Sequence, residues 1–374
     1  MKRAFKIIFI TLSIVFIFLL GFIFALHVFE FRPAENKEIL VVDNLADADD
    51  NYIKLDTEIS LLSFNTGYAS LSQTEDFVMD GGNKTKMDSK AEVEVNIDGI
   101  KTILTRESVD IYLLQEVDIN SKRSYEINQH QIYQESLTNY NSTFAYNYRS
   151  IFVPYPINPI RMLGKINSGL ATYSNFYVES SNRIQLPGSF PWPVRLANLK
   201  RALLINRYPI ASSDKELVVI NLHLSAYDDG SMRKQEMEKL KSIMLEEKNQ
   251  GNYVIAGGDF NQSFPEAYLD YDSTNDYEYK ELYELKKTNN WEALALEKTW
   301  FVENDFIFGI DSATPTCRLL NKPMDIDDSS NNQYYLIDGF ILSDNITIIS
   351  VKTLDENFKY SDHNPVKLVV KLNS

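Results

Sequence analysis

The sequence predicts a layered α/β domain preceded by one transmembrane helix, and three observations support this prediction. A long apolar run follows the N-terminus, many short apolar segments have the pattern of strands, and two longer segments have helical periodicity. The chain has 374 residues and 44% of them are hydrophobic, which suffices for a sizeable core. The net charge of −15 disfavours a broad basic surface for nucleic acid. The single cysteine excludes an intrachain disulfide and argues against a cysteine-based metal site.

The N-terminal segment has the features of an uncleaved membrane anchor. Basic residues precede an apolar run from Ile7 to Leu26, and about 20 such residues cross a bilayer as a helix. A cleaved signal peptide is the alternative, although its apolar region is normally shorter and ends at a small-residue cleavage site. The basic residues before the run predict that the C-terminal bulk lies outside the cytoplasm. We therefore expect an anchor over residues 1–30, an acidic linker over 31–55 and a globular domain over 56–374.

The rest of the chain alternates predicted strands with two predicted helices. Strands are expected at 58–65, 110–116, 217–224, 253–261, 335–343, 345–354 and 366–372. Amphipathic helices are expected at about 91–107 and 232–247. Two aromatic, proline-rich segments, 151–160 and 186–194, do not fit central strands. We expect them to be covering loops or, alternatively, contacts to a substrate or a membrane.

Polar residues recur at or near the ends of these predicted strands. They are Asn65, Glu116, His223, Asp259, Asn261, Asp338, Asp362 and His363. One acidic residue at a strand end is usually a cap or turn residue, but the repeated pattern indicates a shared site. If the strand ends converge, their carboxylates repel one another, and a divalent cation would relieve that repulsion. Oxygen donors favour Mg²⁺, with Mn²⁺ or Ca²⁺ as alternatives, over zinc, and such a site suits hydrolysis of a phosphate ester.

The stretches that carry these residues also resemble the motifs of a known family. In chain order they read "LLSFN", "LLQEV", "NLHLSA", "GGDFNQ", "LIDGFILS" and "SDHNPV", and they cover about 58–371. In this order they are similar to the motifs of the endonuclease/exonuclease/phosphatase superfamily, and "GDFN" with "SDHNPV" is the most specific combination. The resemblance implies a four-layer αββα sandwich of the deoxyribonuclease I type, with the active site at one edge. The chain resembles a membrane-anchored bacterial member of this superfamily. The resemblance implies a catalytic domain over residues 56–374.

The resemblance implies a role for each matching residue. The metal positions correspond to Asn65, Glu116 and Asp362, and the catalytic positions correspond to His223, Asp259, Asn261, Asp338 and His363. Among the catalytic residues, His363 would contact the scissile phosphate, Asp338 would orient that histidine, and Asp259 would activate or align the attacking water. The middle region departs from the family pattern, and there Asn167 and Arg201 are candidates for substrate contacts.

Three functions remain open on the sequence. The first is a membrane-tethered, extracytoplasmic phosphodiesterase for a lipid headgroup or small phosphoester, favoured by the anchor, the acidic charge and the aromatic segments. The second is a nuclease for extracellular DNA or RNA, favoured by His223 and opposed by the charge of −15. The third is an inactive binding protein, which the complete set of expected site residues opposes. The expected partners are a phosphodiester substrate and, through the N-terminal helix, a membrane; no protein partner is predicted.

Overall fold

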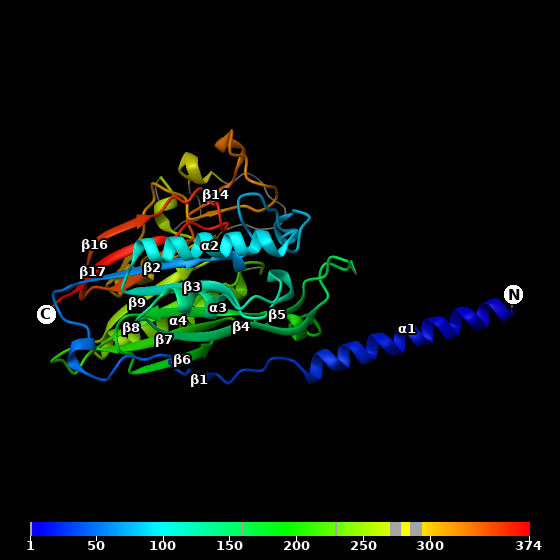
Figure 1. Cartoon of the computed structure of the whole chain (residues 1–374), viewed down its shortest axis with the longest axis horizontal. Coiled ribbons are helices and arrows are strands. Elements are labelled where there is room, and N and C mark those ends of the chain that lie inside the picture. The colour runs from blue at the N-terminus through cyan, green and yellow to red at the C-terminus, as the bar shows by residue number, and fades with distance from the viewer. Residues whose placement is uncertain (1, 159, 229, 270–277, 285–293) are drawn as a thin grey trace.

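Two β-sheets lie face to face at the centre of the domain, with helices on their outer faces (Figure 1). The computed structural model describes residues 2–158, 160–228, 230–269, 278–284 and 294–374. The seven-stranded sheet has the order β1 (Asn36–Glu38), β6 (Ser180–Gln185), β7 (Ala202–Pro209), β8 (Glu216–His223), β9 (Tyr253–Asp259), β15 (Asp338–Ser343) and β12 (Phe306–Gly309). The six-stranded sheet has the order β16 (Ile346–Thr353), β17 (Val366–Leu372), β2 (Glu58–Asn65), β3 (Ile111–Asp118), β5 (Gly164–Ser174) and β4 (Asn141–Val153). Two short pairs join β10 (Gln262–Ser263) to β11 (Leu294–Ala295) and β13 (Cys317–Arg318) to β14 (Tyr334–Tyr335).

Helices cover the outer faces of both sheets. The helices are α1 (Lys2–Val28), α2 (Lys90–Glu107), α3 (Gln129–Ser136), α4 (Ser231–Asn249) and α5 (Thr299–Glu303). Helix α2 begins at a capping box in which Ser89 and Glu92 each accept a hydrogen bond from the other's backbone N–H. Helices α2 and α3 pack on the six-stranded sheet, and α4 packs on the seven-stranded sheet. The two long helices predicted from periodicity are thus present with nearly the expected bounds.

Alternation along the strands explains why the layers form. In β2, Leu61 packs between the two sheets and its neighbour Leu62 packs under α2. In β8, Val219 packs between the sheets and Val218 packs under α4. Successive strand side chains point to opposite faces, so these central strands bury apolar residues on both faces. The four-layer αββα sandwich is therefore confirmed.

Helix α1 extends away from the domain and is exposed along most of its length (Figure 1). Among the described helices, α1 is the one that is long and apolar enough to cross a membrane. At its C-terminal end Leu26 is buried, and the Phe22 ring centroid lies 5.8 Å from that of Phe152 in β4. The last turns of α1 therefore pack against the domain.

The segment expected to be a linker, 31–55, is partly incorporated into the domain. Its strand β1 pairs antiparallel with β6, Val42 forms a bridge with Ser142, and Ile53 is fully buried in the core between the sheets. The side chains of β1 are all exposed, so this three-residue edge strand leaves no hydrophobic pattern in the sequence.

Candidate active site

Strand register brings the predicted polar residues to one edge of the sandwich. In the seven-stranded sheet, His223 of β8 is aligned with Asp259 of β9, and Asp259 is aligned with Asp338 of β15. In the facing sheet, Asn65 ends β2, and Glu116 lies near the end of the neighbouring strand β3. Because β2–β3 and β8–β9 are parallel pairs, the carboxyl ends of these strands lie at the same edge.

The "GGDFN" stretch lets two strands approach closely before the chain turns into the site. Gly258 has φ +149°, and a Cβ atom at this position would lie 2.0 Å from the carbonyl oxygen of Leu222 in β8. Only glycine fits there, and the close approach places Asp259 beside the end of β8. Asn261 then takes φ +49°, donates its backbone N–H to Asp259 Oδ1 at 2.9 Å and donates its amide to Leu224 O at 2.8 Å. Asn261 therefore holds the Asp259 carboxylate in position.

A hydrogen-bonded histidine–aspartate pair lies next to Asp259. His363 Nδ1 and Asp338 Oδ2 are 2.8 Å apart, and both side chains are almost completely buried. The other ring nitrogen, Nε2, lies 3.4 Å from the Asn65 amide, 3.7 Å from Asp259 Oδ2 and 3.9 Å from Asp362 Oδ2. Burial alone would lower the pKa of His363, but the surrounding negative charge, Asp338 foremost, holds that pKa well above its ordinary value. The imidazole is therefore held as a cation.

The second histidine of the site has the opposite electrostatic setting. His223 Nε2 lies 3.3 Å from Asp259 Oδ2, and its Nδ1 lies 4.0 Å from Glu116 Oε1. Burial lowers the pKa of His223 well below its ordinary value, and the nearby cations Arg201 and His363 lower it further. Its buried Nδ1 has no hydrogen-bond partner among the described residues. Burial also raises the pKa of Asp259 to about 6, with repulsion from Asp338 as the second cause. A charged histidine, His363, and a neutral histidine, His223, thus both lie next to the Asp259 carboxylate.

The residues expected to hold a metal ion form a group of oxygen donors. Glu116 has φ +57° within the bulge that breaks the pairing of β3 with β5 between Leu114 and Val117, and the bulge turns this side chain into the site. Burial raises the pKa of Asp362 to about 7, and repulsion from Glu116 contributes. Burial likewise raises the pKa of Glu116. Together with the Asn65 amide oxygen, these two carboxylates fit a hard divalent cation, which would favour their ionised forms.

Two compact groups of potential metal ligands also involve His363. The first joins it to Asp259 and Asp338, and the second joins it to Cys317 and Asp362, with ligand atoms within 4.8 Å of one another. In the first group the hydrogen bond to Asp338 occupies one imidazole nitrogen. In the second, burial raises the pKa of the Cys317 thiol to about 12, and a thiol is a soft ligand that hard cations such as Mg²⁺ disfavour. Apart from the Cys317 thiol, both groups consist of acidic and histidine side chains of the kind that could hold a metal ion.

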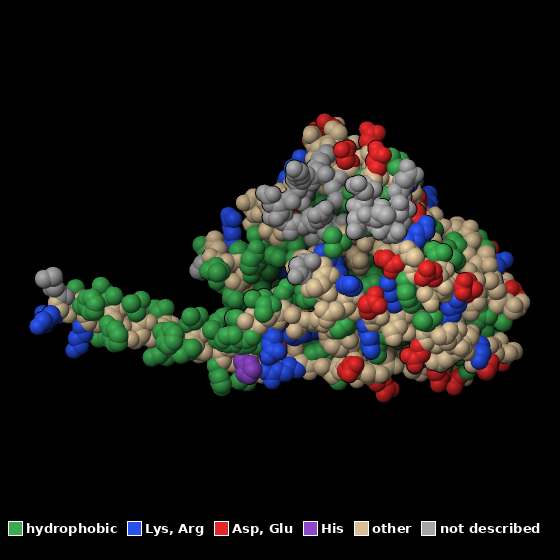
Figure 2. Space-filling model, turned by 180° about the vertical axis from the view of Figure 1, so that it is seen from behind, with side chains coloured by type: hydrophobic (Ala, Val, Ile, Leu, Met, Phe, Trp, Pro, Cys, Tyr) green, Lys and Arg blue, Asp and Glu red, His purple; other side chains and the backbone are tan. Residues whose placement is uncertain are grey.

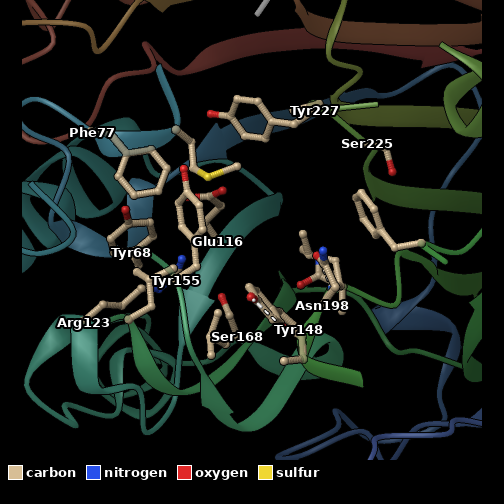
Figure 3. Close-up of a pocket in the computed structure, with 18 of the residues that line it drawn as sticks. Tyr68, Phe77, Glu116, Arg123, Tyr148, Tyr155, Ser168, Asn198, Ser225 and Tyr227 are labelled. Carbon is tan, nitrogen blue, oxygen red and sulfur yellow. Dashed lines mark hydrogen bonds between the residues drawn. The ribbon is translucent and has the colours of Figure 1, made fainter. Parts of the chain in front are cut away.

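A cavity of about 830 Å³ gives access to these residues. Seven of the eight residues predicted for metal binding and catalysis line it: Asn65, Glu116, His223, Asp259, Asn261, Asp362 and His363. Asp338 lies behind His363 and does not line the cavity itself. In Figure 3, Tyr68, Phe77, Tyr155 and Tyr227 surround the side chain of Glu116. The charged floor of the cavity is therefore enclosed by aromatic walls.

Several residues that line this cavity are not among those predicted from the sequence. Arg123 forms a buried ion pair with Asp118, 3.0 Å between Nη2 and Oδ1, and its guanidinium lies 3.5 Å from the ring centroid of Tyr68. Tyr227 donates its hydroxyl to Asp80 Oδ1 at 2.5 Å. Arg123 lies in a single 3-10 turn, Lys122–Ser124, and Tyr227 lies in a loop, and neither segment shows a periodic pattern in the sequence. For Arg123, the available signal was a basic residue shortly after the site glutamate in "LLQEVDINSKR".

The two candidates for substrate contacts differ in their positions. Arg201 lines the cavity, and its buried Nε has no hydrogen-bond partner among the described residues. Burial lowers the pKa of Arg201. Asn167 is not among the residues that line the cavity; it donates its side-chain amide to Asn120 O at 3.0 Å, while its neighbour Ser168 does line the cavity. Successive side chains of β5 point to opposite faces of the sheet, so Ser168 lines the cavity and Asn167, one position earlier, does not.

Comparisons with known proteins agree with this geometry. No curated protein matches the chain by sequence. An endonuclease/exonuclease/phosphatase from Beutenbergia cavernae DSM 12333 is 15% identical with a TM-score of 0.54, covering 85% of this chain and 72% of that one. A family member from Bacteroides vulgatus is 14% identical with a TM-score of 0.52, covering 85% of this chain and 100% of that one. ANGEL2, a 2',3'-cyclic phosphatase, is 14% identical with a TM-score of 0.51, and the match covers 90% of this chain and 99% of that one.

At these identities the structural likenesses show the fold. The sequence model of the Endonuclease/Exonuclease/phosphatase family matches residues 89–363, which is more than half of the chain. Members of this family are phosphoesterases and nucleases that generally use divalent metal ions, and the chemistry of the cavity floor agrees with this. The chain therefore belongs to the endonuclease/exonuclease/phosphatase family.

Proposed function

We propose that this protein is a divalent-metal-dependent phosphodiesterase that cleaves its substrate by in-line attack of water, and that its catalytic domain is tethered outside the cytoplasm. The observation that carries the proposal is the hydrogen bond of 2.8 Å between His363 and Asp338, on a cavity floor that also holds the Asp259 carboxylate. An imidazolium fixed by Asp338 can stabilise negative charge on a phosphate. A neighbouring carboxylate of raised pKa can accept a proton from the attacking water.

His363 acts on the phosphate in this proposal. Asp338 binds Nδ1, so the Nε2–H is the donor that faces the Asp259 carboxylate, 3.7 Å away at the cavity floor. A phosphate oxygen that gains negative charge in the transition state would accept this hydrogen bond. Asp338 is a positioning residue, because it fixes the ring and its charge without lining the cavity.

Asp259 and His223 act on the water. The Asp259 carboxylate can accept a proton, and its orientation is held by Asn65 at 3.0 Å and by the Asn261 backbone at 2.9 Å. His223 is neutral and can donate a hydrogen bond to the phosphate or to the water. A divalent cation, Mg²⁺ first and Mn²⁺ or Ca²⁺ as alternatives, would be held by Asn65, Glu116 and Asp362 and would offset the charge of the phosphate.

The membrane tether rests on α1 and on the charges that flank it. The helix has 27 residues and a mean hydropathy of 3.0 over its most apolar window. The basic residues Lys2, Arg3 and Lys6 precede its apolar run, and this charge distribution favours the extracytoplasmic side for the domain. Protease added to intact cells is expected to remove the domain; complete protection of the domain would contradict this orientation.

The catalytic proposal is tested with the full-length protein in detergent and bis-para-nitrophenyl phosphate as a soluble diester. Turnover should require Mg²⁺, stop with EDTA and return when Mg²⁺ is restored. The variants Asp259→Asn and His363→Ala should lose turnover, while Asp214→Asn, the same change on an exposed loop, should not. Unchanged turnover in both site variants would rule out the proposal.

A nuclease is the second candidate. Family membership and the position of His223 beside Asp259 favour it, and the net charge of −15 opposes tight binding of a nucleic-acid backbone. Plasmid DNA and RNA therefore belong among the substrates tested, with His363→Ala as the control for contaminating nuclease.

A further inference from the structure

We propose that the substrate is a membrane lipid with a phosphodiester headgroup, which reaches the site sideways from the bilayer along α1. This inference rests on the proposed phosphodiesterase activity and names its substrate class. Water would add to phosphorus, the ester P–O bond would break, and the leaving oxygen would take up a proton. The products would be an alcohol and a phosphomonoester, one of which keeps the acyl chains.

The first observation is that one cavity joins the membrane helix to the catalytic floor. Its lining includes Leu19, Phe22, Ile23 and Leu26 of α1 as well as Asp259 and His363. The helical residues lie at the end of the apolar run, within its last two turns. A run of about 20 residues matches the hydrocarbon core of a bilayer, so these side chains lie at the outer edge of that core. A lipid beside α1 therefore meets the cavity at the level of its headgroup and upper acyl chain.

The second observation is an exposed apolar rim on the other side of the cavity. We call the rim the described residues 151–158 and 160–163 together with 190–199, which overlap the two segments noted for their aromatic and proline content. In the first segment, Tyr155 lines the cavity and Ile157 is 94% exposed; in the second, Val194 lines it and Trp192 is 60% exposed. Figure 2 shows hydrophobic side chains that continue from α1 onto the adjoining face of the domain. Contiguous exposed apolar surface of this kind is typical of a membrane contact, and aromatic residues suit its interface.

The third observation is that polar contacts hold the rim against the end of α1. Glu30, just beyond the helix, has a side chain that is only 3% exposed and lies between three cations. Its carboxylate is 3.2 Å from Lys200 Nζ, 3.0 Å from Arg32 Nε and 3.9 Å from Arg195 Nε. Because Arg195 belongs to the rim and Lys200 directly follows it, these contacts hold the rim at the end of α1, where the helix would leave the bilayer.

A lipid suits this cavity better than a nucleic acid does. A volume of about 830 Å³ lies within the usual range for small-molecule sites of about 300–1,000 Å³ and accommodates a headgroup with part of a chain. Much of the mouth is apolar, and two cations beside it, Lys200 and Arg195, lie within 3.9 Å of the Glu30 carboxylate, whereas a nucleic-acid backbone would need cations that face the substrate. The buried Arg123 and Arg201 line the cavity nearer the floor, where a headgroup anion would lie.

The test compares a lipid with a soluble diester on the same full-length protein. The protein is reconstituted in vesicles of phosphatidylcholine, phosphatidylglycerol and sphingomyelin, and lipid products are measured by mass spectrometry. Bis-para-nitrophenyl phosphate is measured in parallel. The variant Ile157→Asp should reduce the ratio of lipid to soluble turnover at least about tenfold, because a charge at the rim opposes membrane contact. Ile326→Asp, the same change at a residue that is 73% exposed and outside the cavity lining, should leave the ratio unchanged.

The outcomes separate this inference from the proposed function. Cleavage of the soluble diester with every lipid intact would overturn the lipid inference and leave the phosphodiesterase standing. Cleavage of plasmid DNA with the lipids intact would also overturn it, in favour of the nuclease. An equal ratio in wild type and Ile157→Asp would remove the rim from substrate recognition. If the wild-type protein cleaved none of these substrates in the presence of Mg²⁺, the proposed function itself would be contradicted.

Discussion

The floor and the mouth of the active-site cavity are built in different ways. The floor consists largely of polar side chains at strand ends, such as Asp259 and His223, that are nearly inaccessible to solvent and fixed by strand register. The mouth consists of apolar side chains from α1 and from the two rim segments, and several are exposed, such as Ile157. Chemistry that needs fixed geometry lies on the sheets, whereas the part that would select a substrate lies on loops and a helix. Changes at the floor should therefore affect every substrate, and changes at the mouth should affect lipids selectively.

The largest effect is expected at the floor, from His363→Ala. Removing a positioned acid–base group costs about 10³-fold in kcat/KM, within the usual range of 10² to 10⁴. The loss should be the same for the soluble diester and for lipid, which the two assays measure on one preparation. A loss confined to lipid would break the distinction between floor and mouth. Thermal unfolding of the variant serves to exclude a folding defect.

A smaller effect, about 10²-fold, is expected from Asp338→Asn, together with a change in pH dependence. In the wild type, Asp338 holds the pKa of His363 well above its ordinary value, so activity that needs the imidazolium persists until the pH rises through that raised pKa. Without the carboxylate, burial lowers the pKa, and the fall in activity should move to lower pH. The pH profile of kcat/KM measures this shift. An unmoved basic limb would mean that His363 does not act as the cation.

Metal dependence should respond to Glu116→Gln. Loss of one charged oxygen donor should raise the Mg²⁺ concentration for half-maximal activity about tenfold or more, as expected for a weakened metal site. Titration of activity with Mg²⁺ checks this, and Ile157→Asp is the contrasting mouth variant because it leaves the oxygen donors untouched. If Glu116→Gln and wild type show the same Mg²⁺ curve, Glu116 is not a metal ligand.

The smallest effect is expected where the mouth meets the membrane helix, from Glu30→Gln. This variant removes the charge that Lys200 and Arg32 contact, so the rim should be held less firmly against α1. We expect a decrease of about two- to threefold in the ratio of lipid to soluble turnover, in line with the modest energy of partly exposed ion pairs. Glu38→Gln, at an exposed position of β1, is the matched control. An effect on soluble turnover alone would place Glu30 with the floor rather than the mouth.

The sequence by itself determined the parts that local pattern encodes. Alternation and apolar runs predicted the strands that end at Asn65 and Asp259, and the helices α2 and α4. The polar residues at those strand ends came together because parallel neighbours share an edge. Local pattern is insufficient where an element is short or lacks periodicity, so the sequence predicts a linker over β1 and no role for Arg123.

Only the tertiary structure decided how the cavity is completed. Phe22 in the first 30 residues, Tyr155 in one rim segment and Val194 in the other line one cavity although they are far apart in the sequence. It also decided that Ser168 rather than Asn167 faces the cavity, since one position along β5 reverses the face. The physical reason is that strand and helix periods are local, whereas contacts between α1, the rim and the floor form only when the sheets have packed.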